Sequence, residues 1–595
     1  MPGRRPRTAR SVTLGSGLML VLAGCLGQDV APSGGPTRPP GTSPGQTAVP
    51  SGIPSTGPFE PIRFPTGDPA PCDEDASDDP AFGPYRGSIR SIAATDERTV
   101  VFELCDSDPA FLAKVASPAL AINDTAWLQS RIDPAGGPSR ILTEVNGTGP
   151  FRLAAFGDGQ EVTLSRFDGY WGERARTRAA VFVAEGDARR RLEKVTEGSV
   201  DAIDVVAPAD IPAVDANPDL TLIPREGLNV AYIGFNDRFA PFDRAAVRQA
   251  ISVGIDRAAI LEAGFPPGTE LATHFLPCAI QFGCEGGPWP DPDPTLAREW
   301  LAGAGFPDGF ATTITFADEP RDYLPEPRAT ATALQVQLRE YLGIEATLEA
   351  VPFETLTAEA DTGRLDGLYL LGARTRYPDA TVLLDRHFGP DSSAQFGARR
   401  EDVLRALELA RTSADPAVRA LNYGRANDRL RAHVPMIPLS HVGSAAAFRS
   451  DLRGGHATAT ATDRWSTVVP GDRAQFVMMQ STRPASLYCA DETEDATLRI
   501  CAQLSESLYR LDIPEPRLSS ALAEQCVPDP DLVIWTCTLR SGVRFHDGSL
   551  LDANDVVLSY AVQWDATHLL HRGREGAFQA FQDRFGGFLH PPPSS

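Results

Sequence analysis

A few serine and histidine motifs in this chain contain the residue types used in catalysis or metal binding. Residues 41–45 (GTSPG) match the GxSxG pattern of a serine nucleophile, but no strand precedes them and no helix follows. Residues 546–548 (HDG) have the order of a base and its orienting carboxylate, yet this tripeptide is also typical of a turn. His568 and His571 offer two metal ligands, fewer than a metal site needs. These motifs predict no catalytic residue and no cofactor.

The chain has nine cysteines, and eight remain if Cys25 is used elsewhere. An even number is typical of a disulfide framework outside the cytoplasm. Local context suggests three bridges as a hypothesis, Cys278–Cys284, Cys489–Cys501 and Cys526–Cys537, and Cys72 and Cys105 are left for each other as a fourth. The rival is a metal site formed by His274 with Cys278 and Cys284. No CxxC or HExxH accompanies these residues, so we expect disulfides and no metal.

The first residues have the organisation of an export signal. A stretch with four arginines precedes the apolar run 12–23, which is shorter than the ~20 residues that span a bilayer. It ends in Leu22-Ala23-Gly24-Cys25, which resembles a bacterial lipobox, and this resemblance implies a lipid on Cys25. We therefore expect a signal peptide at 1–24, and a lipid as the only membrane anchor. Residues 25–69 are rich in Pro, Gly, Ser and Thr and read as a disordered tether.

Composition sets further bounds on the fold and the partners. The 595 residues are 42% hydrophobic and 22% charged, which is globular and too long for a single core. The net charge of −23 argues against nucleic acid as a partner, because phosphate binding needs clustered Lys and Arg. We interpret the acidity as a contribution to solubility.

The central stretch of the chain, residues 227–264, predicts a strand followed by a helix. Residues 228–236 are apolar on both faces of the period-2 pattern, which indicates a strand buried on both sides. Asp243 is placed to cap the helix that follows, whose apolar residues recur at helical spacing. Further strands are expected at 161–166, 311–316, 345–351 and 365–371, and helices at 294–305, 330–342, 401–412 and 417–433. This alternation predicts an α/β fold.

The amino-acid sequences of these segments resemble those of one protein family. The stretches GLNVAYIGFN, PFDRAAVRQAI and IDRAAIL, the turn and strand NGTGPFRL, and the helix-containing RLEKVTEGSVDAIDVV are similar to family 5 extracellular solute-binding proteins. The family includes oligopeptide-, dipeptide- and nickel-binding components of ABC importers. The resemblance implies a type II periplasmic-binding-protein fold: two α/β lobes with a cleft between them, plus an additional subdomain. It also implies that the strand at 228–236 runs along the floor of the cleft.

The order of the motifs departs from the family. Residues 436–441 (MIPLSH) resemble the strand that closes family members, yet the chain continues. Its last part, including LRSGVRFHDGSLLDANDVVLSY, resembles material from the family's N-terminal region. We therefore interpret the chain as a circular permutation, with a solute-binding domain at 70–465 completed by 466–595. A truncated tandem, with one copy lacking its start and a second lacking its end, is the alternative.

The resemblance also suggests residues that contact a ligand. Residues 374–379 (RTRYPD) occupy the loop where peptide-binding relatives read W-x-x-D-x-x-D, whose first Asp pairs with the ligand's α-ammonium. Here Arg376 takes the place of that Asp, and a guanidinium repels an ammonium but pairs with a carboxylate. Either Arg376 binds an anionic or sugar-like group, or it points to solvent. The cleft segments of the family suggest further candidates: Tyr232, Tyr377, Asp379, Met479, Ser481 and Tyr488.

The function implied by this resemblance is capture of a solute rather than catalysis. Two lobes would close on a small molecule or peptide and deliver it to an ABC permease with its ATPase. We expect a monomer held at the outer face of the bacterial membrane by its lipid. A ligand-sensing lipoprotein without a transporter is the main alternative, because fold does not fix function. A secreted hydrolase is the other, and it needs a nucleophile and a base facing each other inside the cleft.

Overall fold

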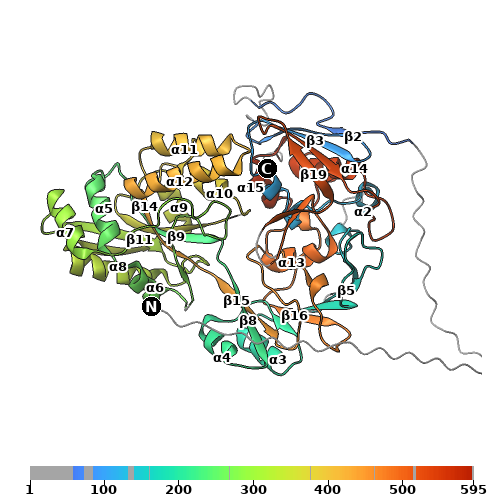
Figure 1. Ribbon diagram of the computed structural model, residues 1–595, viewed down its shortest axis with the longest axis horizontal. Helices are drawn as coiled ribbons and strands as arrows, with labels where there is room; N and C mark the ends of the chain where they lie inside the picture. The colour runs from blue at the N-terminus through green and yellow to red at the C-terminus, as the bar shows by residue number, and fades with distance from the viewer. Residues whose placement is uncertain are drawn as a thin grey trace, which may run out of the picture. The chain divides into compact units, whose positions relative to one another are not determined.

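The protein is described by a computed structural model that covers residues 58–72, 85–131, 140–157, 159, 161–266, 268–375, 377–460, 462–513 and 517–591. These described residues form one compact unit. Within this unit, residues 228–441 build lobe B, and the described residues on either side of that range build lobe A (Figure 1). Two short crossings, 226–227 and 442–443, connect the lobes. The predicted signal peptide 1–24 and Cys25 lie outside the described residues.

Lobe B is organised around strand β9 (Asn229–Gly234), every residue of which is buried. β9 runs antiparallel to both of its neighbours, and Tyr232 lies opposite Leu371 on one side and Pro438 on the other. The strand order is β10-β14-β9-β13-β11-β12. The other strands are β10 (Glu270–Leu271), β11 (Ala311–Ala317), β12 (Glu345–Val351), β13 (Leu368–Arg374) and β14 (Met436–His441).

Helices pack against this sheet, with α11 and α12 on one side and α6, α7 and α8 on the other in Figure 1. They are α5 (Ala245–Gly254), α6 (Arg257–Gly264), α7 (Pro294–Gly303), α8 (Pro327–Leu342), α9 (Phe353–Asp361), α10 (Thr381–Phe388), α11 (Glu401–Arg411) and α12 (Pro416–His433). The expected cap at Asp243 is wrong. The chain is still turning there, since Arg244 donates its N–H to Pro241 O, so α5 begins at Ala245 without a side-chain cap.

Lobe A contains a seven-stranded sheet in which a late strand lies among early ones. β16 (Phe476–Gln480) pairs in parallel with β6 on one side and β7 on the other. The order is β4-β5-β6-β16-β7-β15-β8. The other strands are β4 (Phe151–Phe156), β5 (Glu161–Arg166), β6 (Ala179–Ala184), β7 (Ala202–Ile203), β8 (Leu220–Arg225) and β15 (Ser444–Arg449). The helices of this part are α3 (Ala188–Thr196), α4 (Ile211–Asp215) and α13 (Asp495–Leu504).

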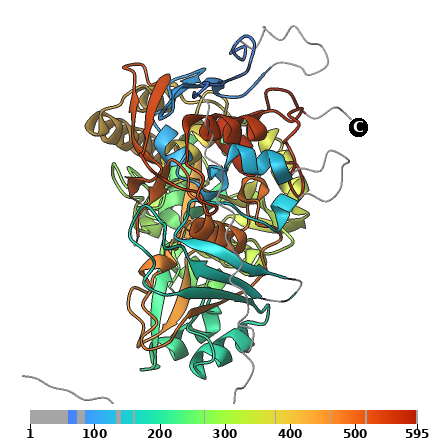
Figure 2. The same ribbon diagram turned by 90° about the vertical axis from the view of Figure 1, so that its right-hand side faces the viewer.

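The five-stranded sheet of lobe A mixes the two ends of the chain in the same way. Its order is β1-β2-β3-β20-β19, so β20 (Ile534–Leu539) pairs with β3 (Thr99–Leu104). The other strands are β1 (Arg63–Phe64), β2 (Ile89–Asp96) and β19 (Ala523–Pro528), and a separate hairpin joins β17 (Tyr509–Leu511) and β18 (Leu518–Ser520). The helices are α1 (Phe111–Lys114), α2 (Thr125–Arg131), α14 (Ala553–Trp564) and α15 (Gln579–Phe585). Figure 2 shows the blue and dark red segments side by side.

Short 3₁₀ turns complete the described elements. They are η1 (Pro118–Leu120), η2 (Arg140–Leu142), η3 (Pro208–Asp210), η4 (Trp465–Thr467) and η5 (Cys489–Asp491).

The two ends of lobe A meet at Ser88 and Phe585. The Ser88 N–H donates to Phe585 O at 2.6 Å, and Leu589 N–H donates to Trp564 O at 2.8 Å. The folded part also begins before residue 70, inside the segment expected to be a tether. Phe64 packs edge-on against Trp564 at 5.6 Å, because β1 adds to the edge of the five-stranded sheet.

The structure has disulfides at Cys72–Cys105, Cys278–Cys284, Cys489–Cys501 and Cys526–Cys537. These are the four pairs suggested by the sequence, and their Cα–Cα separations of 5.2, 5.0, 5.9 and 3.9 Å all lie below the ~7 Å limit for a bridge. In the described part of the chain, no helix has both the length and the apolar character to cross a membrane.

Candidate functional site

A cleft of about 1000 Å³ lies between the two lobes. Lobe B contributes residues from β9, β13 and the segment after it, and lobe A contributes residues from the η1 region, α13 and α15. A solute in this cleft would therefore touch both lobes at once. The buried strand β9 reaches the cleft through Tyr232, as the resemblance implied for the cleft floor.

Aromatic side chains make one part of the cleft wall. Tyr232, Tyr323, Phe353 and Tyr377 all belong to it. The Tyr232 hydroxyl donates to Gln395 Oε1 at 2.9 Å, which fixes the ring. His387 lies beside Tyr232, and burial lowers the pKa of its imidazole to about 4. The imidazole is therefore neutral at pH 7 and contributes an uncharged ring to the cleft wall.

Charged side chains of both signs also line the cleft. The cations are Arg374, Arg386 and Arg584, and the acids are Asp361, Asp391, Asp495 and Asp583. Arg374 is ion-paired with Asp322, just outside the cleft wall. A wall with separated positive and negative groups and aromatic surface suits a small polar or zwitterionic solute.

Only some of the ligand-contact residues predicted from the sequence line the cleft. Tyr232 and Tyr377 line the cleft, whereas Arg376 lies outside the described residues. Asp379 is buried, and both of its oxygens accept hydrogen bonds from Arg419 Nη2 at 2.9 Å, so its charge is already neutralised. The remaining three, Met479, Ser481 and Tyr488, are not among the described residues of the cleft wall.

Those three side chains serve the packing of lobe A. Met479 on β16 is buried in a small apolar cluster. The Ser481 hydroxyl donates to Asp204 Oδ2 at 3.3 Å. Tyr488 is buried in the core under the five-stranded sheet. The family pattern had placed all three near the cleft, but the register of β16 and the turn after it direct them into the lobe.

The residues considered from the sequence as metal ligands or as a catalytic base form bonds that stabilise the fold. Potential ligand atoms of His274, Cys278 and Cys284 lie within 4.8 Å of one another, but the two cysteines form a disulfide. The His546 imidazole accepts from Gly147 N–H at 3.3 Å and donates to Gly149 O at 3.1 Å. Both of its ring nitrogens therefore hold the turn at 147–149, and neither pairs with Asp547 as a catalytic base would.

Residues 65–395, more than half of the chain, match the family described as bacterial extracellular solute-binding proteins, family 5 middle. The chain belongs to this family. Its members bind solutes and are not enzymes, which agrees with the absence of a catalytic signature in the sequence.

Similar proteins are named for different solutes. Heme-binding protein A of Haemophilus influenzae is 27% identical over 371 residues, or 62% of this chain and 67% of the relative. Di/tripeptide-binding protein 1 of Pseudomonas aeruginosa is 27% identical over 363 residues, or 60% and 66%. The matched segment thus spans about two thirds of these curated relatives. The solved structure of HbpA2 from Haemophilus parasuis has a TM-score of 0.61 at 25% identity and covers 64% of this chain and 75% of that one.

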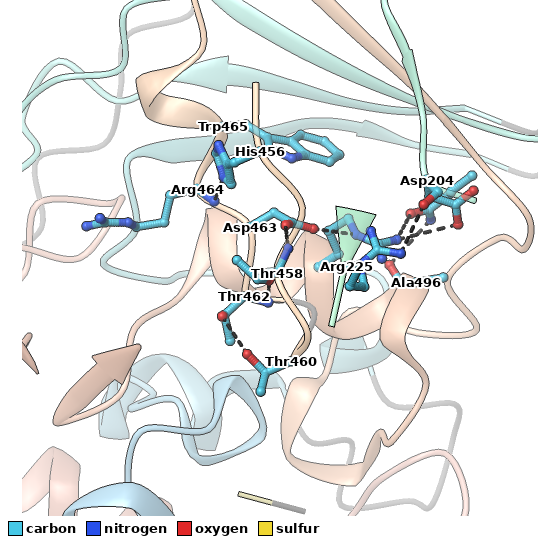
Figure 3. Close-up of polar contacts among 12 residues, drawn as sticks. Asp204, Arg225, His456, Thr458, Thr460, Thr462, Asp463, Arg464, Trp465 and Ala496 are labelled. Carbon is cyan, nitrogen blue, oxygen red and sulfur yellow. Dashed lines mark hydrogen bonds and ion pairs between the residues drawn. The ribbon is translucent and has the colours of Figure 1, made fainter. Parts of the chain in front are cut away.

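In this solute-binding protein, a buried charge network lies where lobe A meets both crossings (Figure 3). Arg225, the last residue of β8, donates through Nη1 to Asp204 O at 3.0 Å and to Ser444 Oγ at 3.1 Å. Arg499 on α13 donates to Asp463 Oδ2 at 2.8 Å and lies 3.6 Å from Asp204 Oδ2. Since β8 and β15 carry the chain into and out of lobe B, this network fixes the lobe A ends of both crossings.

The two lobes also meet at Lys114 of lobe A and Tyr377 of the cleft wall. Lys114 Nζ donates to Asp108 Oδ2 at 2.6 Å and lies 5.7 Å from the centre of the Tyr377 ring of lobe B. Burial opposes the charge of Lys114, but Asp108 raises the pKa of the ammonium, which stays protonated. Lys114 is one of only two lysines in the sequence, and that rarity was the one signal that could have singled it out.

Proposed function

We propose that this protein captures a small polar or peptide-like solute in the cleft by closure of the two lobes and delivers it to an ABC permease with its ATPase. The observation that carries the proposal is the cleft wall, which lobe A and lobe B build together around β9 and α13. A solute that contacts both walls favours the closed arrangement of the lobes by its differential affinity. Relatives named for heme and for di- and tripeptides support a solute of this size range.

The group that recognises the solute's charge differs from that of the peptide-binding relatives. Arg376 replaces the acidic residue that the resemblance assigns to the α-ammonium, and Asp379 is neutralised by Arg419. The loop at 374–379 therefore favours an anionic or sugar-like group over a free ammonium. Tyr232 and Tyr377 would pack against the apolar part of the solute.

We also propose a lipid on Cys25 as the membrane anchor, with the folded part on the extracytoplasmic side as a monomer. The lipobox-like LAGC supports the lipid, and the four disulfides suit an oxidising compartment. Residues 26–57 then connect the lipid to the first described residue, long enough for the folded part to stand away from the membrane.

A circular permutation explains why strands from residues 476–539 lie among strands from residues 89–225. β16 and β20 occupy interior places in the two sheets of lobe A, where a separate second copy would not insert. Ser88 and Phe585 are in hydrogen-bond contact, which makes the junction of the two pieces short. The alignment with heme-binding protein A covers 62% of the chain. Partial coverage supports the permutation, because an alignment that keeps the residue order can follow only one of the two pieces of a permuted chain.

Native mass spectrometry of the protein purified from its own host tests solute capture. We expect a bound small molecule that is released on unfolding, and its mass identifies the solute. Thr375→Trp places an indole in the cleft wall and should lower the bound fraction at least about tenfold, while the exposed control Thr196→Trp leaves it unchanged. A solute-free wild type, or equal occupancy in Thr375→Trp, contradicts the proposal.

A further inference from the structure

A second cavity, of about 340 Å³, opens beside the cleft within lobe A. It shares the wall residues Ala116, Pro118, Thr462 and Leu511 with the cleft. An elongated solute can therefore occupy the cleft with its main part and extend one end into this side cavity.

Arginine dominates the charge of the side cavity. Arg174, Arg176, Arg464 and Arg510 line it, against two acids, Glu173 and Glu506. This excess is notable in a chain whose net charge is −23. A concave, positively charged wall attracts anions, and guanidinium groups bind carboxylates and phosphates in a bidentate way.

The described residues of the protein engage Arg464 and Arg510 only in part. Arg464 Nη2 and Arg510 Nε lie 3.7 and 4.0 Å from Asp512 Oδ1, too far for a direct hydrogen bond, and Arg510 Nε donates instead to Ser519 Oγ at 3.3 Å. Arg464 Nε is buried without an acceptor among the described residues. Figure 3 shows that the Arg464 side chain leaves the backbone on the side away from Asp463 and the buried charge network. Its guanidinium is thus available to the side cavity.

The acid and the aromatic rings of the cavity are held in a fixed arrangement. Glu506 is half-buried, and its two oxygens accept hydrogen bonds from Tyr170 Oη and Trp171 Nε1, both at 2.7 Å. Glu506 therefore orients the two rings, while the guanidinium groups of the wall remain for an incoming group. The two rings present apolar surface next to those arginines.

We propose that the side cavity binds an anionic group, a carboxylate or a phosphate, at one end of the solute that the cleft captures. Arg464 and Arg510 would donate to the anion, and Tyr170 and Trp171 would contact the apolar atoms next to it. This inference rests on the proposed function, because it names the chemical class of the solute's end.

Calorimetric titration with benzoate and phenyl phosphate tests the proposal, with benzyl alcohol as the uncharged counterpart. We expect an anion to bind and to change Trp171 fluorescence, a change that disappears in Trp171→Phe. Preference for benzoate identifies a carboxylate site, and preference for phenyl phosphate identifies a phosphate site. Arg464→Gln combined with Arg510→Gln should weaken binding at least about tenfold, while the exposed control Arg190→Gln leaves it unchanged. Arg464→Lys, which keeps the charge, should retain part of the affinity.

The proposal is overturned if neither anion binds, if benzyl alcohol binds equally well, or if the double variant binds as wild type does. Circular dichroism and thermal unfolding establish that the double variant is folded, and Arg464→Lys provides the test if it is not. If the anion titration fails but native mass spectrometry still finds a solute that Thr375→Trp does not bind, only the anion site is wrong and solute capture is retained. If native mass spectrometry finds no solute in the wild type, the proposed function itself is wrong.

Discussion

Asp463→Asn is expected to destabilise the protein by about 3–5 kcal/mol, the cost of breaking a buried ion pair from one side. Asp463 and Arg499 are both almost fully buried, at 1% and 3% side-chain exposure, and their 2.8 Å contact is the shortest ion pair of the charge network. The amide can still accept from Thr458 N–H, but its NH₂ group would face the Arg499 guanidinium and leave only Asp204, 3.6 Å away, to compensate that charge. Urea unfolding at pH 7 measures the loss.

The same pair predicts a pH dependence. Burial disfavours the carboxylate, but Arg499 and Arg225 hold the pKa of Asp463 below its ordinary value. A folded pKa below the unfolded one gives stability that is present above the unfolded pKa of about 4 and is lost as pH falls through the folded value. The difference between wild type and Asp463→Asn should therefore shrink in acid. The exposed pair at Lys194 is the control, where Glu197→Gln should cost less than about 1 kcal/mol at pH 7. Equal losses in the two variants would contradict a structural role for the network.

A chain that ends at Gly471 is expected to lose cooperative folding. It lacks β16 from the interior of the seven-stranded sheet, which is thereby split, and it lacks β20 and β19, which reduces the five-stranded sheet to β1, β2 and β3. The cores beneath them lose the aromatic and aliphatic side chains of α13, α14 and α15. Thermal unfolding followed by circular dichroism should show no sharp transition for the lobe A part.

The matched variant has the chain order that the proposed permutation assigns to the family. It begins at Asp472, joins Leu589 to Pro58 through a flexible Gly/Ser linker of about ten residues, and ends at Gly471. The cut lies in an exposed loop, where new termini are well tolerated. We expect it to unfold cooperatively within a few degrees of wild type. A folded truncated chain, or a rearranged chain that does not fold, would refute the permutation.

Regular apolar patterns made much of the fold predictable from the sequence. The strands expected at 161–166 and 345–351 appear with those bounds, because alternation and polar ends define them locally. The buried strand β9 was also expected, although Asp243 does not cap the helix after it, because hydrogen bonds from the preceding turn delay the helix start. Periodicity does not determine the exact residue at which a helix begins.

The candidate site was predicted less completely, since a cleft wall is assembled from segments far apart in the chain. Tyr232 and Tyr377 line the cleft, but Asp379 is paired with Arg419, which is forty residues away in the sequence. No local sequence pattern predicts that ion pair. The side cavity likewise joins arginines at 174–176 with Arg464 and Arg510. Their proximity depends on residues 466–591 folding back onto lobe A, which only the three-dimensional arrangement reveals.

A crystal structure of the protein purified with its own solute would show where the solute binds. We expect electron density between the lobes, in contact with Tyr232 or Tyr377 of lobe B and with Asp495 or Thr462 of lobe A. A stoichiometric solute bound on an outer face, with the cleft empty, would contradict this expectation.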